Sequence, residues 1–203
     1  MTISILLTMF TFSLVMSISP GPVNIMILSS SINNGFLKTF SFISGATIGF
    51  TLLLIFIVFG FSTILLDYPN FLAYLGIIGS IFIIYMGYKI ATSTNTIEIS
   101  KEDKKLKFHE GFLLQWLNPK AWLACFSGSS MFSISTTSLI ILVVIYFFVC
   151  YISLSLWGIL GQKATFILST NFRLKIFNIF MGSLLIISAF YLIVINYIDL
   201  IGT

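Results

Sequence analysis

The chain has 203 residues, of which 58% are hydrophobic and only 8% are charged. Soluble globular proteins carry about 25% charged residues, so this composition excludes a soluble enzyme, a disordered chain and a small disulfide-stabilised scaffold. We therefore expect an all-α integral membrane protein, in which the net charge of +4 must be explained by where the charges lie.

Uncharged runs taken in chain order predict six membrane-spanning helices, because about 20 apolar residues are needed to cross the hydrocarbon core. The runs are long and continuous, which argues against the alternating strands of a β-barrel. The predicted spans cover residues 3–31, 39–66, 71–88, 111–132, 138–161 and 176–198. The longest connection contains the polar segment 93–107, which we interpret as a linker.

Lysine and arginine residues fall in alternate loops, and this orients the chain. They follow predicted spans one, three and five, whereas the other loops and both termini contain none. These residues are Lys38, Lys89, Lys101, Lys104, Lys105, Lys107, Lys163, Arg173 and Lys175. By the positive-inside rule their loops are cytoplasmic and both termini lie outside the cytoplasm. The basic charge is thereby explained by membrane topology, and nucleic acid is not expected as a partner.

The two halves of the chain resemble each other weakly. Residues 79–84 of the third span are similar to residues 182–187 of the sixth, and proline interrupts the first and fourth spans at corresponding places. We therefore expect one transporter domain of two three-helix units, residues 1–92 and 108–203. Because each unit has an odd number of spans, the second is inverted relative to the first. Inverted units with corresponding broken helices are typical of secondary transporters.

The interruptions consist of Ser19, Pro20, Gly21 and Pro22 in the first span, and of Asn118 and Pro119 in the fourth. We expect Ser19-Pro20 and Asn118-Pro119 each to start a helix, with Ser or Asn as the N-cap and Pro in the first turn. Helix N-termini favour anions, and the carbonyl groups freed before them favour cations, so the breaks suit a zwitterionic amino acid. The alternative is that these prolines only kink packed helices.

Lys120 directly follows the second break, near the predicted bilayer centre. An ammonium group at that depth costs about 2.5–3.5 kcal/mol on insertion scales. The acidic residues Asp67, Glu110 and Asp199 all lie near span ends and leave Lys120 without a partner. A substrate carboxylate would supply one, and the alternative is that Lys120 reaches a water-filled inner vestibule.

Three further polar residues near the breaks, Asn24, Gln115 and Asn118, complete the predicted substrate site. Each could bind substrate or bond only to a neighbouring helix. Glu110, at the mouth of the fourth span, is the candidate for a coupling proton, and the alternative is a solvated carboxylate at a helix end. The sequence contains no metal-ligand spacing and no nucleophile–base pair, so we expect no catalytic residue, metal or cofactor.

Motifs around both breaks are familiar from a known family. The first comprises SPGPVN at 19–24, NGF at 34–36 and GATIG at 45–49. The second comprises FHEGF at 108–112, Gln115 and NPKA at 118–121. Together with Gly76, Gly79, Gly87 and Gly182, these motifs resemble the signatures of the LysE/RhtB family of amino-acid exporters.

The resemblance implies a proton-driven secondary exporter, an antiporter, of the bacterial inner membrane, with an amino acid and the lipid bilayer as partners. KIATS at 89–93 is most similar to exporters of cysteine and O-acetylserine, although homoserine and threonine exporters share the main signatures. The absence of a deep carboxylate argues against a strongly cationic substrate such as lysine. A homodimer is compatible with this interpretation.

Two rival classes remain as alternatives. A membrane thiol redox carrier would need facing cysteines in spans one and four, but the two cysteines are Cys125 and Cys150, in spans four and five. We expect both to be small packing residues. An ion or water pore would show unsaturable flux that does not depend on a proton gradient.

Overall fold

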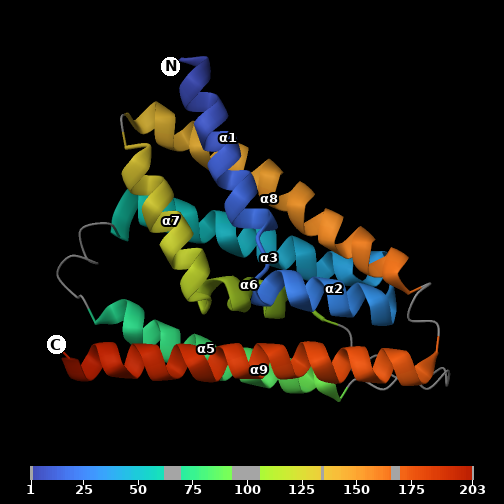
Figure 1. The fold of residues 1–203 in the computed structure, drawn as a ribbon. Coiled ribbons are helices and arrows are strands. Elements are labelled where there is room, and N and C mark those ends of the chain that lie inside the picture. Colours follow the sequence, from blue (N-terminus) through green and yellow to red (C-terminus); the bar gives the residue numbers. More distant parts are fainter. Residues whose placement is uncertain (1, 62–69, 93–105, 134, 166–169, 203) are drawn as a thin grey trace.

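The computed structural model describes residues 2–61, 70–92, 106–133, 135–165 and 170–202. Within these ranges the chain is helical almost throughout and contains no strand. The elements are α1 (Ile3–Ile18), α2 (Pro22–Asn34), α3 (Phe36–Phe56), the π-helical turn η1 (Ile57–Phe61), α5 (Phe71–Ala91), α6 (Phe108–Trp116), α7 (Pro119–Met131), α8 (Thr136–Ala164) and α9 (Asn171–Gly202) (Figure 1). Asp67 and most of the predicted linker 93–107 lie outside the described residues.

Each predicted span coincides with a helix or with a pair of consecutive helices. The observed helices extend further, since α9 begins at Asn171 rather than at residue 176, and α8 continues to Ala164 rather than to residue 161. Polar and basic residues form these additional turns. A helix can continue beyond the hydrocarbon because long basic side chains reach the polar interface.

Among the described residues, four helices are long and apolar enough to cross a membrane alone, and there are up to five such spans if α1 and α2 form one. The axes of α1 and α2 differ by 59°. The shorter helices α6 and α7 are not among these spans. The count of six spans in two inverted units therefore remains a prediction.

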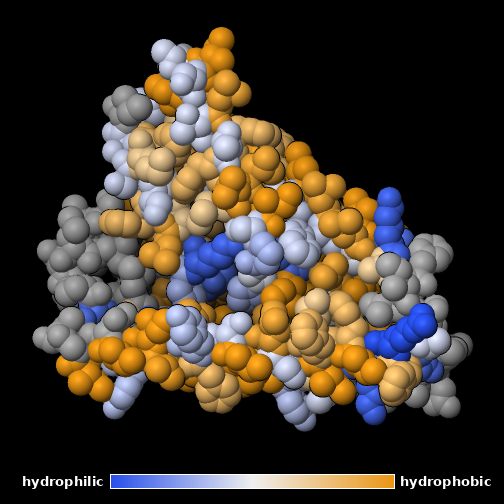
Figure 2. Space-filling view, viewed as in Figure 1, coloured by the Kyte–Doolittle hydropathy of each residue, from blue (hydrophilic) through white to orange (hydrophobic). Residues whose placement is uncertain are grey.

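Large apolar side chains cover the outside of the molecule, and Figure 2 shows them over most of the visible face. On α9, Ile187 is 68% exposed and Phe190 is 57% exposed; on α8, Ile152 is 61% exposed. Soluble monomers do not expose contiguous apolar surface of this extent. The protein is a multi-pass membrane protein.

Helices α5 and α9 form an antiparallel pair along one side of the molecule, and the other helices gather around α3 and α8 (Figure 1). Glycine permits backbone contact in both places. A Cβ atom on Gly87 of α5 would lie 2.9 Å from the carbonyl oxygen of Gly182 in α9. A Cβ on Gly49 of α3 would lie 2.9 Å from the Cα of Phe112 in α6. Close approach through small residues is characteristic of helix packing in membranes.

The helices α3, α6 and α9 all begin at the same end of the molecule, where α2, α5 and α8 finish (Figure 1). This basic end carries the described lysine and arginine residues other than Lys120. They are Lys38, Lys89, Lys107, Lys163, Arg173 and Lys175. Hydrophilic side chains gather at the same end in Figure 2.

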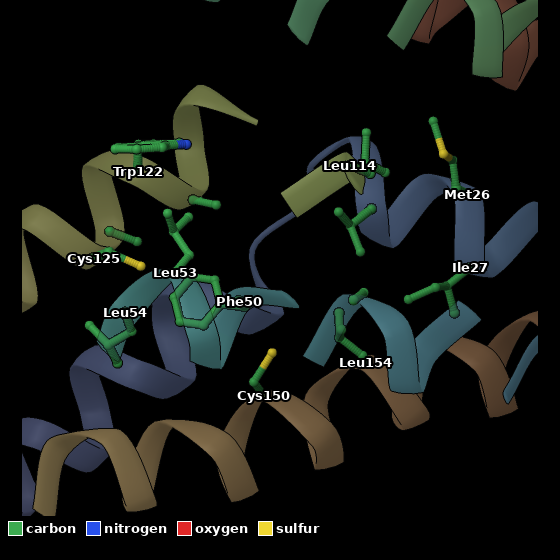
Figure 3. Packing of buried hydrophobic residues seen from close by; sticks show 14 of the residues in the cluster. Met26, Ile27, Phe50, Leu53, Leu54, Leu114, Trp122, Cys125, Cys150 and Leu154 are labelled. Atoms are coloured by element: carbon green, nitrogen blue, oxygen red, sulfur yellow. The ribbon is translucent and has the colours of Figure 1, made fainter. Parts of the chain in front are cut away.

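The core between α2, α3, α7 and α8 is apolar and fully buried (Figure 3). Met26 and Ile27 of α2 lie in it together with Leu53 of α3, each 0% exposed. Cys125, on α7, is also 0% exposed in this cluster, as expected for a packing residue. Cys150, on α8, joins the same cluster but also faces the central cavity described below.

Candidate functional site

The two helix breaks meet inside the molecule through Lys120. Its Nζ atom donates hydrogen bonds to the carbonyl oxygen of Ser19 at 2.8 Å and to the Ser19 hydroxyl at 2.7 Å. The two residues are 101 positions apart in the sequence. The prolines therefore do more than bend separate helices, because they bring a charged side chain from one break onto the freed backbone of the other.

The first break does not have the predicted form. The N–H of Ser19 bonds to Val15 O at 3.1 Å, so Ser19 ends α1 instead of capping a new helix. Helix α2 begins at Pro22, with Gly21 as its N-cap and without a side-chain cap. The prediction that Ser19-Pro20 starts a helix was wrong, because the second proline also suits a first helical position and lies two residues further on.

Three side chains, one from α2 itself and two from other helices, bond the carbonyl groups that the first break frees. The Nδ2 of Asn24 donates to Ser17 O at 3.0 Å, and the indole Nε1 of Trp157 donates to Ile18 O at 3.1 Å. With Lys120 on the next carbonyl, three successive freed acceptors are satisfied. This matters in a membrane protein, where no water is available to bond freed backbone groups within the hydrocarbon region.

The second break has the predicted form. Asn118 caps α7, with its Oδ1 accepting the backbone N–H of Lys120 at 3.1 Å, and Pro119 occupies the first turn. The Nε1 of Trp122 donates to Trp116 O at 2.7 Å, which satisfies a carbonyl group at the end of α6. The prediction of a capped helix start at Asn118 is confirmed.

A small cavity of about 30 Å³ lies where the breaks meet, and it has room for about two water molecules. Five residues predicted for the substrate site line it: Gly21, Asn24, Gln115, Asn118 and Lys120. Ser19 takes part through its bonds to Lys120, whereas Pro20, Pro22 and Pro119 shape the breaks without lining the cavity. Figure 2 shows a hydrophilic hollow in the middle of the apolar face, over this junction.

The cavity is suited to a carboxylate. Lys120 supplies a positive charge, and the uncapped N-terminus of α2 lies beside it, since a Cβ on Gly21 would be 3.3 Å from Nζ. No acidic side chain of the described residues lines the cavity. The Gln115 side chain lines it too and makes no hydrogen bond with another described residue, so its amide is available to a ligand.

Glu110 lies outside this cavity. It is in the first turn of α6 at the basic end, where its Oε1 is 2.5 Å from the Nζ of Lys89 on α5. Its Oε2 accepts the backbone N–H of Lys107 at 2.8 Å. Both carboxylate oxygens are therefore bonded within the protein, and Glu110 links α5 to α6 away from the candidate substrate site.

Residues 14–195 match the LysE type translocator family. The chain belongs to that family. It is therefore a transport protein and not an enzyme.

Similar relatives carry a more specific name. Proteins called cysteine/O-acetylserine efflux protein from Escherichia coli K12, Escherichia coli O1:K1 and Shigella sonnei are each 31% identical to this chain over 138 residues. The matched segment is 68% of this chain and 70% of each relative. No solved structure matches the chain.

Part of the cavity lining could not be predicted from the proline motifs, and it comes from α3 and α8 as well as from neighbouring positions on α1, α2 and α7. The unpredicted lining residues are Met16, Ser17, Val23, Phe50, Ala121, Ala124, Tyr146, Cys150 and Leu154. Tyr146 and Cys150 are four positions apart on α8 and so lie on one face. That spacing was visible in the sequence, but nothing in it indicated which face of α8 meets the breaks.

Proposed function

We propose that this protein exports small neutral amino acids and derivatives, of the cysteine and O-acetylserine type, across the bacterial inner membrane by alternating access. The observation that carries the proposal is Lys120, whose Nζ bridges the two breaks at the edge of a polar cavity. In the proposed complex, the substrate carboxylate takes the place of Ser19 as the partner of Lys120, assisted by the uncapped N-terminus of α2.

A neutral substrate fits the charge of the cavity. One lysine balances one carboxylate, and the substrate ammonium group would be held by amide and carbonyl oxygens near Asn24 and Gln115. A second positive charge, as in lysine, would find no acidic partner among the described residues that line the cavity. The relatives are named for efflux of cysteine and O-acetylserine, which agrees with this chemistry.

Alternating access is proposed because the cavity is too small for an amino acid. A volume of about 30 Å³ holds only water, so the helices around it must separate before a substrate binds. The antiparallel pair α5 and α9 and the bundle around α3 and α8 are natural moving parts, since Figure 1 shows them as two layers.

We also propose the topology of six spans with both termini outside the cytoplasm, in which α1–α2 and α6–α7 each form one broken span. The contacts between helices support two related units. In this arrangement α1–α2, α3 and α5 of the first unit correspond to α6–α7, α8 and α9 of the second. Helix α3 packs on α6, and the corresponding helix α8 packs on α1. The third helices of the two units, α5 and α9, pack on each other. The basic residues gathered at one end support a cytoplasmic location for that end.

Transport in reconstituted vesicles tests the proposal. Purified protein is placed in liposomes, and the flux of labelled cysteine, O-acetylserine, homoserine and threonine is measured with and without an imposed pH gradient. We expect saturable flux that an opposing proton gradient accelerates. Flux of none of these compounds above that of protein-free liposomes would refute the function, and unsaturable flux that ignores the gradient would indicate a pore.

Proton coupling is assigned to Glu110 as part of this proposal. Protonation would neutralise its ion pair with Lys89 and so release α5 from α6 at the basic end. We expect Glu110→Gln to abolish transport driven by a pH gradient while exchange of labelled for unlabelled amino acid continues. If the variant still accumulates substrate in response to the gradient, Glu110 does not carry the coupling proton.

A further inference from the structure

The cavity has a second side that the proline motifs do not supply. Ser17 at the end of α1, Phe50 on α3, and Tyr146 and Cys150 on α8 also line it. If the substrate carboxylate binds Lys120, as the proposed function requires, the substrate side chain must point toward this remaining wall. The selectivity of this wall for the substrate side chain is therefore inferred on the basis of the proposed function.

Ser17 lines the cavity and carries a buried hydroxyl without a hydrogen-bond partner among the described residues. The residue is 8% exposed. The hydroxyl of Tyr146 and the thiol of Cys150 lie close enough to interact with Ser17, but neither has hydrogen-bond geometry with its hydroxyl. Buried hydroxyl groups are almost always bonded in proteins, so an unbonded one on a residue that lines a cavity is suited to a ligand atom that donates or accepts a hydrogen bond.

Aromatic packing fixes this wall in place. The ring of Tyr146 stacks on Phe50, with centroids 4.4 Å apart, and meets Phe12 edge-on at 6.2 Å. Tyr146 is only 2% exposed, so its ring cannot move aside without disturbing both neighbours. Figure 3 shows the Cys150 side chain directed from α8 toward Phe50. A rigid wall of this kind limits the length of the side chain that can be accommodated.

We propose that Ser17, Tyr146 and Cys150 form the subsite for the substrate side chain, and that the Ser17 hydroxyl selects short side chains that end in a hydrogen-bonding atom. A thiol, a hydroxyl or an ester oxygen would bond to Ser17. An aliphatic side chain of equal size would leave Ser17 unpaired. A site built to bond a polar group discriminates against the apolar analogue for this reason.

Competition transport tests the subsite with two amino acids of equal shape. Cysteine and 2-aminobutyrate differ in a terminal thiol against a methyl group, and each is used to inhibit uptake of labelled cysteine into inside-out membrane vesicles. We expect cysteine to inhibit at an about tenfold lower concentration, the scale of one hydrogen bond. Ser17→Ala should reduce this ratio to about one, since the variant loses the selecting hydroxyl and keeps the Ser17 carbonyl that bonds Asn24.

Ser31→Ala is the matched control. Ser31 also has a buried hydroxyl without a hydrogen-bond partner among the described residues, but it lies on α2 away from the cavity. We expect this variant to keep the ratio of the unmodified protein. An unchanged ratio in Ser17→Ala would overturn the subsite while leaving the export function intact. Absence of cysteine transport by the unmodified protein would instead refute the proposed function.

Protection of Cys150 supplies a second measurement that does not depend on the fold of the Ser17 variant. In Cys125→Ala, Cys150 is the remaining cysteine, and its alkylation by N-ethylmaleimide is followed by mass spectrometry. O-Acetylserine at ten times its dissociation constant should slow alkylation about tenfold, because about one site in eleven stays free. The same concentration of 2-aminobutyrate should protect much less. Alkylation that O-acetylserine does not slow would contradict the subsite.

Discussion

The first break takes two of its three side-chain donors from other helices and the third from its own Asn24, whereas the second break is closed by its own residues. At the first, Trp157 of α8 and Lys120 of α7 bond the freed carbonyl groups of Ile18 and Ser19. At the second, the Asn118 cap and the indole of Trp122 come from the broken segment itself.

This difference separates two roles. Where side chains of other helices bond the freed carbonyl groups, a ligand can replace one of these partners. The backbone geometry of such a break does not depend on any single one of these hydrogen bonds. A break whose hydrogen bonds are formed by its own residues is rigid, and it can position a side chain that contacts another segment. We infer that the first break is the adaptable half of the site and that the second positions Lys120.

The largest effect is expected from Lys120→Ala, which removes the side chain that bonds the second break to the first. Export should fall about 100-fold, since hydrogen bonds to a charged group contribute about 1.5–3 kcal/mol and tenfold corresponds to 1.4 kcal/mol. Lys163→Ala is the control, because Lys163 is exposed in the last turn of α8 at the basic end. If both variants transport equally well, Lys120 has no role in substrate binding.

Gly21→Ala tests the contact between the two breaks, because the added methyl group would meet the Lys120 side chain. The new Cβ would lie 3.3 Å from Nζ and 3.4 Å from Cδ of Lys120, so the lysine must shift by a few tenths of an ångström. We expect up to about tenfold weaker substrate binding, because misplacement by a full ångström can cost about 100-fold. Gly60→Ala, where a Cβ meets nothing within 4 Å, should bind as the unmodified protein does. Equal affinities for the two variants would contradict close contact at Gly21.

The smallest effects distinguish the two breaks directly. Trp122→Phe leaves Trp116 O without its indole donor and should lower the melting temperature by about 2–6 °C, with affinity unchanged within about twofold. Trp157→Phe removes the donor to Ile18 O and should weaken substrate binding about threefold as well, because it loosens the segment that contacts Lys120. Thermal melts and substrate titrations on both variants provide the measurement. A larger loss of affinity in Trp122→Phe would reverse the assignment of roles.

Much of this architecture could be predicted from composition and proline position. Continuous apolar runs located the helices, and Asn118-Pro119 identified the start of α7 because an amide cap before proline has one favourable arrangement. The first break was predicted less well, since two prolines in SPGP offer two possible helix starts and only packing against Lys120 and Trp157 decides between them.

The wall of the cavity around Tyr146 could not be predicted at all. Which face of α8 turns inward depends on contacts with α1 and α3, such as the stacking of Phe50 on Tyr146. A helix that is apolar all round carries no periodic signal of its buried face. The breaks could therefore be located from the sequence, whereas the cavity residues on α8 could not.

The most direct test of the account is a cycle that changes Lys120 and the substrate carboxylate together. Binding of cysteine and of cysteinamide, which lacks the carboxylate charge, is measured by titration of the purified protein and of Lys120→Ala. We expect the unmodified protein to prefer cysteine by about 100-fold and Lys120→Ala to bind both compounds equally within about twofold. A preference for cysteine that persists in Lys120→Ala would show that the carboxylate binds elsewhere, and would contradict the central claim.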